Sequence, residues 1–161
     1  MQLMNTSIHD RKGQAGVGLI EILIAVLVLS IGFLGMAALQ TKALSNNNSA
    51  MARTQATIAS YSILDAIRAD RANALAGDYN QTVTVGSCPG AGNTLANGQL
   101  SRWCSGTAGV APPDGLAALG NGATGEVACD GNGICEITVT FDDDNATGGH
   151  SAQEVVTRAR L

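Results

Sequence analysis

Glu21 is the only ionisable side chain in an apolar run from Gly16 to Leu39, which reads GVGLIEILIAVLVLSIGFLGMAAL. A carboxylate at the centre of a membrane helix costs about 2.5–3.5 kcal/mol, so it is retained mainly where it has a specific partner. Val17 and Glu21 are four residues apart, and a helix places such residues on one face. A cation on this face, from the same or a neighbouring chain, could therefore pair with the Glu21 carboxylate. Such pairs depend on orientation, so the predicted chemistry is the setting of stagger between helices.

The apolar run is long enough to span a bilayer. As a helix, residues 17–39 would reach about 34 Å, which exceeds the hydrocarbon core. A cleavable secretory signal usually has an apolar stretch of only about 7–15 residues. Arg11 and Lys12 precede the run and predict that the N-terminus lies on the cytoplasmic side. The alternative for Glu21 is a side chain that reaches the lipid headgroups without a specific partner.

The segment from Arg11 to Glu21 resembles the class III signal of type IV prepilins and pseudopilins. It has a basic leader that ends in Gly16, followed by an apolar helix with Glu at the fifth position. The resemblance implies cleavage between Gly16 and Val17 by a membrane prepilin peptidase, N-methylation of Val17, and extraction from the inner membrane into a fibre. Val17 stands where the family usually has Phe, so the assignment of the cleavage site depends on Gly16 and Glu21.

The sequence predicts a leader at 1–16, a transmembrane and assembly helix at 17–39, an amphipathic helical stem at 40–76 and a globular β domain at 77–161. No proline interrupts the stem, and Gly77 is predicted to end it. Apolar residues recur in the stem at steps of seven and three, which predicts one helical stripe packed against the chain's own globular domain. A coiled coil is the alternative. The stripe consists of Leu44, Met51, Ile58, Tyr61, Leu64 and Ile67.

The globular region is predicted to be a small antiparallel sheet. Cys135, Ile137, Val139 and Phe141 alternate with polar residues, which predicts a strand with one buried face. Its expected partner is 154–161, reached through an acidic loop at 142–145. The sequence Asp-Gly-Asn-Gly at 130–133 predicts a hairpin turn, and 82–85 is a further short strand. No element is assigned to 85–124. The predicted fold class is therefore α+β and pilin-like, a long N-terminal helix packed on a small antiparallel β-sheet.

Cys88, Cys104, Cys129 and Cys135 lie in this exported region. They form no Cys-x-x-Cys pair and have no histidine at zinc-finger spacing, so no metal site is expected. An even number of cysteines in an oxidising compartment indicates disulfides. Three pairings are possible, of which we favour Cys88 with Cys104 and Cys129 with Cys135.

The sequence contains no arrangement of residues that is typical of an enzyme active site. His9 lies in the leader and His150 in a turn, so neither is well placed as a general base. The run Asp142, Asp143, Asp144 and Asn145 lacks the spacing of an EF-hand and is interpreted as a solvated loop. No phosphate-binding loop or nucleophile elbow occurs. We expect neither catalysis nor a cofactor.

The formal net charge of −4 disfavours a nucleic-acid partner, as does the small aromatic content. Without the leader the formal net charge would be −5, because the charges of Asp10, Arg11 and Lys12 in the leader sum to +1.

The stretch 53–80, the single Trp103 and the terminal strand ITVTFDD narrow the resemblance to the PilV type of minor prepilin, the type IV pilus modification proteins. This resemblance implies a minor pilin that helps to initiate or cap a type IV pilus. The implied partners are other minor and major pilins, the prepilin peptidase, a tip adhesin and inner-membrane lipid. The implied location is the inner membrane, with one pass and a periplasmic C-terminal domain, and then the pilus at the cell surface. The alternatives are a minor pseudopilin of type II secretion and a tip module that binds ligands for adhesion or DNA uptake.

Overall fold

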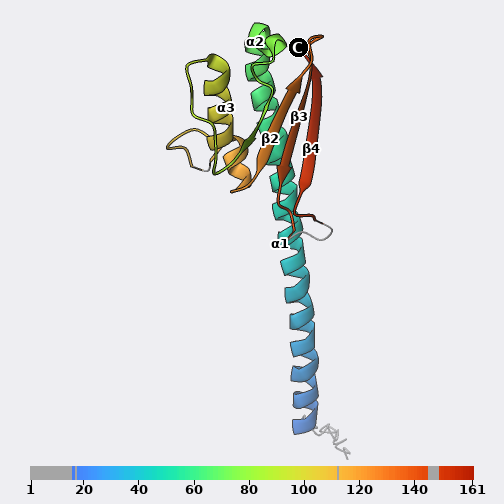
Figure 1. The fold of residues 1–161 in the computed structure, drawn as a ribbon. Helices are drawn as coiled ribbons and strands as arrows, with labels where there is room; N and C mark the ends of the chain where they lie inside the picture. The colour runs from blue at the N-terminus through green and yellow to red at the C-terminus, as the bar shows by residue number, and fades with distance from the viewer. Residues whose placement is uncertain (1–15, 17, 112, 145–148) are drawn as a thin grey trace, which may run out of the picture. The chain divides into compact units, whose positions relative to one another are not determined.

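The computed structural model describes residues 16, 18–111, 113–144 and 149–161. The chain divides into two compact units, Met1–Gln40 and Thr41–Leu161. Most of the predicted leader, and Val17 itself, lie outside the described residues. The elements in chain order (Figure 1) are α1 (Leu19–Ala69), α2 (Arg71–Ala76), β1 (Gln81–Thr84), α3 (Leu95–Ser105), the 3-10 helix η1 (Gly115–Leu119), β2 (Thr124–Cys129), β3 (Ile134–Phe141) and β4 (Gln153–Arg160).

The first unit consists of the N-terminal part of α1. Every side chain described from Gly18 to Gln40 is exposed, although most are apolar. The helix is long and apolar enough, by length and composition, to cross a membrane. Leu, Ile and Val dominate because, in lipid, an α-helix satisfies its own backbone hydrogen bonds and apolar side chains meet apolar solvent. Even Ser30 satisfies its hydroxyl within the helix, donating to the Val26 carbonyl oxygen at 2.7 Å.

In the second unit, α1 buries a different face from the one predicted. Leu64 and Ile67 are buried, but Leu44, Met51 and Ile58 are 65%, 59% and 63% exposed. The buried face includes several small residues as well as large apolar ones. The prediction followed large side chains only and was therefore wrong for the first four members of the stripe. The buried residues of α1 are Ser49, Ala56, Ala59, Ser60, Ile63, Leu64 and Ile67.

The stem is also interrupted, where one continuous helix was predicted. α1 ends at Ala69, and Asp70 separates it from α2. The Asp70 carboxylate accepts hydrogen bonds from Asn73 Nδ2 at 2.9 Å and from the Tyr79 hydroxyl at 3.0 Å. Gly77 ends α2 in the left-handed conformation with φ 89°, as predicted from its position, because glycine adopts positive φ without steric cost.

The four strands form one antiparallel sheet in the order β1-β2-β3-β4. The predicted alternation in β3 is confirmed, since Cys135, Ile137, Val139 and Phe141 are all buried. The predicted β2–β3 turn is also present. Asp130 Oδ1 accepts from the Ile134 backbone N–H at 2.7 Å and fixes that turn. The fold class is the predicted α+β arrangement of a long N-terminal helix with a small antiparallel sheet.

The segment 85–124 contains α3 and η1, for which the sequence analysis assigned no element. Thr94 caps α3 by accepting from the Asn97 backbone N–H at 3.2 Å. Trp103 of α3 donates its indole N–H to the Ala59 carbonyl oxygen of α1 at 2.9 Å. The signal for this helix was available in the sequence: Ala96, Leu100, Trp103 and Cys104 are buried at helical spacing after a capping threonine.

Candidate functional site

Glu21 lies in the first turn of α1 and is exposed. Its backbone N–H donates to the Gly18 carbonyl oxygen at 3.0 Å. It forms no ion pair with any other residue that the structure describes. Acidic side chains are favoured near a helix N-terminus because the free N–H groups there carry partial positive charge. Gly16 is also exposed, whereas the geometry of Val17 lies outside the described residues.

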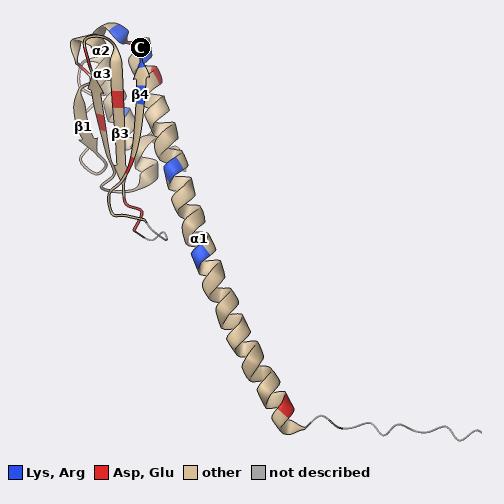
Figure 2. Cartoon of the chain, turned by 90° about the vertical axis from the view of Figure 1, so that its right-hand side faces the viewer, with Lys and Arg blue, Asp and Glu red and all other residues tan. Residues whose placement is uncertain are grey.

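Glu21 lies in the first turn of α1, and α1 contains no basic residue before Lys42. Figure 2 shows how sparse charged residues are along this part of the helix. A helix that is apolar on every side is suited to lipid or to other apolar helices. A Cβ placed on Gly32 or on Gly35 would meet open space. These two positions therefore offer shallow surface where a neighbouring helix can approach closely.

The second unit exposes a row of apolar side chains of its own on α1. Leu44, Met51 and Ile58 follow one another at intervals of seven, and Tyr61 lies beside them. Residues seven positions apart lie two turns apart on nearly the same face of a helix. This row lies away from the residues that bury α1 against the globular core. It was predicted to be internal, and the structure leaves it available for contact.

Two disulfides brace the globular unit. Cys88 and Cys104 are joined at 2.05 Å and tie the loop after β1 to α3. Cys129 and Cys135 are joined at 1.99 Å and close the β2–β3 hairpin. These are the two pairs favoured from the sequence. All four cysteines are therefore oxidised, and the chain has no thiol to serve as a nucleophile or metal ligand.

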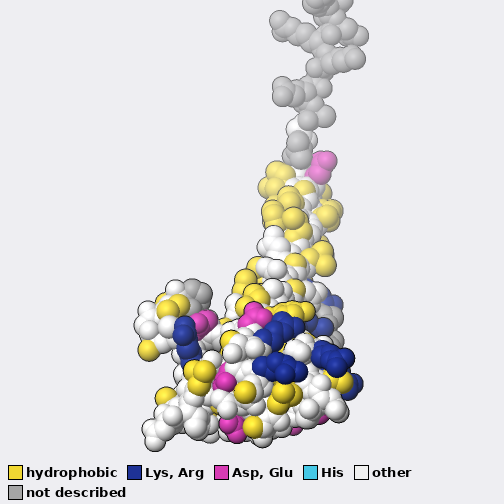
Figure 3. Space-filling view, turned by 90° about the horizontal axis from the view of Figure 1, so that it is seen from above, with side chains coloured by type: hydrophobic (Ala, Val, Ile, Leu, Met, Phe, Trp, Pro, Cys, Tyr) yellow, Lys and Arg dark blue, Asp and Glu magenta, His cyan; other side chains and the backbone are white. Residues whose placement is uncertain are grey.

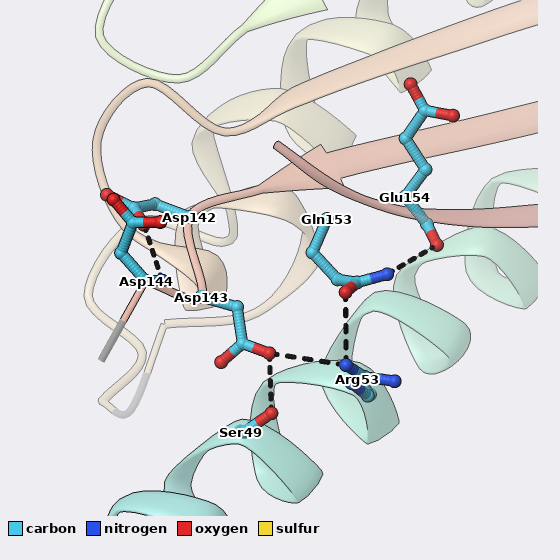
Figure 4. Close-up of polar contacts among 7 residues, drawn as sticks. All are labelled: Ser49, Arg53, Asp142, Asp143, Asp144, Gln153 and Glu154. Carbon is cyan, nitrogen blue, oxygen red and sulfur yellow. Dashed lines mark hydrogen bonds and ion pairs between the residues drawn. The ribbon is translucent and has the colours of Figure 1, made fainter. Parts of the chain in front are cut away.

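The sequence analysis interpreted 142–145 as a solvated loop, and this prediction was wrong for Asp143. Asp143 is only 7% exposed, whereas Asp142 and Asp144 are exposed. Ser49 donates its hydroxyl to Asp143 Oδ2 at 2.5 Å, and Arg53 Nη2 lies 3.5 Å from the same oxygen (Figure 4). Arg53 also donates to Gln153 Oε1 at 3.0 Å. These contacts fasten both ends of the β3–β4 connection to α1, while Asn145 lies outside the described residues.

The side chains of Tyr79 and Asp114 have shifted pKa values, and both form structural hydrogen bonds. Burial and a hydrogen bond to Asp70 raise the pKa of Tyr79. The Tyr79 hydroxyl also lies 2.7 Å from Gln99 Oε1, so it links the α1–α2 break to α3. Hydrogen bonds from the hydroxyl and backbone N–H of Thr107 lower the pKa of Asp114. Among the described residues, no cluster of three or more His, Cys, Asp or Glu side chains could hold a metal ion.

Residues 11–37 match the family model for the prokaryotic N-terminal methylation motif. No curated protein and no solved structure matches the chain. The motif match shows a type IV prepilin-like N-terminus and includes Gly16, Val17 and Glu21. It supports a type IV pilin-like protein, of a family that is typically structural, and it suits membrane anchoring followed by incorporation into a pilus. It also suggests contacts with other pilins and with the prepilin peptidase.

Proposed function

We propose that this chain is a minor pilin that helps to initiate or cap a type IV pilus. The observation that carries the proposal is the coincidence of the methylation motif at 11–37 with an apolar part of α1 that is exposed throughout 18–40 and holds Glu21 in its first turn. We further propose the PilV type of minor pilin, on the resemblance of 53–80 and of the terminal strand.

In the proposed mechanism, the peptidase cuts between Gly16 and Val17, and the amine of Val17 is methylated. Glu21 then accepts the amine of its own or a neighbouring subunit as the helix leaves the membrane. Because a misaligned pair leaves a charge without its partner in low dielectric, the contact selects one stagger between helices. The apolar faces of α1 supply the remaining contact area with other minor and major pilins.

The exposed row of Leu44, Met51 and Ile58 supports an assembly role for the second unit as well. Three large apolar side chains on the solvent side of a helix are unfavourable in an isolated protein and suitable in a packed fibre. In this proposal the globular unit is periplasmic before assembly and surface-exposed afterwards, where it contacts other minor pilins or a tip adhesin.

The decisive variant is Glu21→Ala. It removes the carboxylate and leaves Gly16 and the apolar run unchanged, so processing and membrane insertion should be retained. We expect the processed variant to accumulate in the inner membrane and sheared fibres to fall at least tenfold. The matched control is Ser30→Ala, because that hydroxyl is already bonded within the helix. Normal fibre levels with Glu21→Ala would refute the proposed role of this residue.

Mass spectrometry of the N-terminal peptide tests the processing step separately. The expected mature chain begins with methylated Val17. A start near Ala38, which would indicate cleavage by a secretory signal peptidase, would overturn the prepilin interpretation. Intact pili in a deletion strain, accompanied by a loss of secretion, would instead favour a pseudopilin.

A further inference from the structure

The two edges of the sheet differ in how they are protected. β1 has four residues, and Cys104 Sγ lies 3.3 Å from the Thr84 carbonyl oxygen, so the disulfide covers that edge. β4 has eight residues, contains no proline and pairs with β3 without a bulge from Gln153 to Arg160. Proteins usually protect long edge strands with bulges, prolines or a covering element. The β4 edge lacks the first two.

Hydrogen bonding defines which backbone groups of β4 face this open edge. Leu161 and Gly133 are directly opposite in the β3–β4 register, and the Leu161 N–H donates to the Gly133 carbonyl oxygen at 2.8 Å. In an antiparallel pair, hydrogen-bonded positions alternate along the strand. The odd-numbered residues of β4 therefore bond to β3, and the even-numbered residues direct their N–H and C=O groups outward.

Three of the outward-directed residues are available for pairing. Within the described part of the chain, the backbone groups of Val156, Arg158 and Arg160 have no partner on the open side. The Glu154 carbonyl oxygen receives only a long contact of 3.4 Å from the side chain of Gln153. An added strand could form up to about six backbone hydrogen bonds with these residues, two at each position.

Side chains along β4 would also gain from a covering strand. Val155 and Ala159 pack against the core but are only half-buried, because they lie at its rim. On the other face, Val156 is 55% exposed. A neighbouring strand would cover all three, and apolar area removed from water is stabilising at about 25 cal/mol per Å².

The charges at the C-terminal end of β4 indicate what the added strand should carry. Arg158 and Arg160 are exposed on the same face, and the Arg71 guanidinium lies beside Gly133 at the adjoining turn. Among the described residues, both salt bridges involve other arginines. Glu136 is directly opposite Arg158, whereas the residue opposite Arg160 is the uncharged Ile134. Figure 3 shows basic side chains gathered over this end of the globular unit.

We propose that the open edge of β4 binds an extended acidic segment of a partner protein as a fifth strand. The backbone groups would supply affinity, and the arginines would select carboxylates, which guanidinium groups bind through paired hydrogen bonds. A polyanion would use the arginines and leave the backbone edge unpaired. This inference is independent of the proposed function.

The test uses the full chain in detergent micelles and a capped seven-residue peptide designed to lie antiparallel to β4. The peptide has aspartate at the positions beside Arg158 and Arg160, lysine beside Glu154, and valine or threonine elsewhere. The control peptide exchanges the aspartates and the lysine. We expect at least tenfold tighter binding of the acidic peptide, with slower hydrogen exchange at the amides of Val156, Arg158 and Arg160.

Val156→Pro tests pairing through the backbone. It removes an outward N–H but no hydrogen bond to β3, so the sheet should be retained, and binding should fall at least tenfold. Val156→Thr keeps the N–H and should bind normally. If the proline variant unfolds, the double variant Arg158→Glu with Arg160→Glu provides the test. This variant should bind the control peptide more tightly than the acidic peptide. Lys42→Glu is its control, a charge change elsewhere on the unit.

Equal binding of the two peptides, or exchange protection away from β4, would overturn the proposal. So would binding of duplex DNA that survives Val156→Pro, because the arginines would then be a polyphosphate surface without strand addition. A concentration-dependent dimer of the chain that disappears with Val156→Pro would identify a second copy as the occupant and would also overturn it.

Discussion

The two compact units of this chain differ in the exposure of their apolar side chains. Described side chains up to Gln40 are exposed, and most are apolar. The second unit has a core built from α1, α3 and the sheet, and two disulfides brace it. The first unit therefore needs lipid or other helices to cover it, whereas the second can bury its own apolar surface.

The two units also differ in whether a short sequence pattern can identify their function. The methylation motif ends at residue 37, within the first unit. Its function depends on a few spacings along one helix, which a short sequence pattern can hold. The binding surface that we propose for the second unit combines a free sheet edge with arginines from α2 and β4. Such a surface has no short sequence signature.

The largest expected effect tests the assignment of α1 faces. Leu64→Ala should lower the free energy of unfolding of the second unit by about 3 to 5 kcal/mol, because Leu64 is fully buried. Met51→Ala removes a side chain of similar size from the exposed face and should change stability by less than about 0.5 kcal/mol. Chemical denaturation monitored by Trp103 fluorescence measures both. Similar losses from the two variants would mean that both faces are buried.

The disulfides should matter to the second unit alone. Replacing Cys88 and Cys104 together by serine should cost about 3 kcal/mol, and replacing Cys129 and Cys135 about 2 kcal/mol, because the shorter loop restricts the unfolded chain less. The sequence separations are 16 and 6. Thermal unfolding of the separate double variants provides the ranking. Loss of helix from residues 19–40 on reduction would contradict the independence of the two units.

The smallest expected effect concerns Tyr79, which lies inside the second unit. Its pKa is raised, so folding favours the neutral phenol, and this contribution is complete below the unfolded value of about 10. It is lost progressively as pH rises from the unfolded value of about 10 through the higher folded value, so stability should begin to decline above about pH 10. Tyr79→Phe should cost about 1 kcal/mol near neutral pH through its lost hydrogen bond, and it should flatten the alkaline decline. Denaturation midpoints between pH 8 and 11 test this, and equal slopes for both proteins would contradict it.

Local sequence determined much of this molecule. The period-two pattern of Cys135, Ile137, Val139 and Phe141 predicted β3, because a strand places alternate side chains on one face. Asp130 and Gly133 predicted the turn, and Gly77 predicted the end of the helical stem. Glu21 and Gly16 predicted the prepilin-like N-terminus, because that motif depends on position along the chain.

Only the tertiary structure decided which face of α1 is internal. Ala56, Ala59 and Ser60 are buried in the globular unit, while the larger Met51 and Ile58 remain exposed. Asp143 belongs to an acidic run that is predicted to be solvated, yet it contacts Ser49 and Arg53 of α1, which lie ninety or more residues earlier in the chain. The open edge of β4 likewise depends on strand order, which alternation along a single strand does not specify. These features arise from contacts between distant segments, and the residues in any one segment do not determine them.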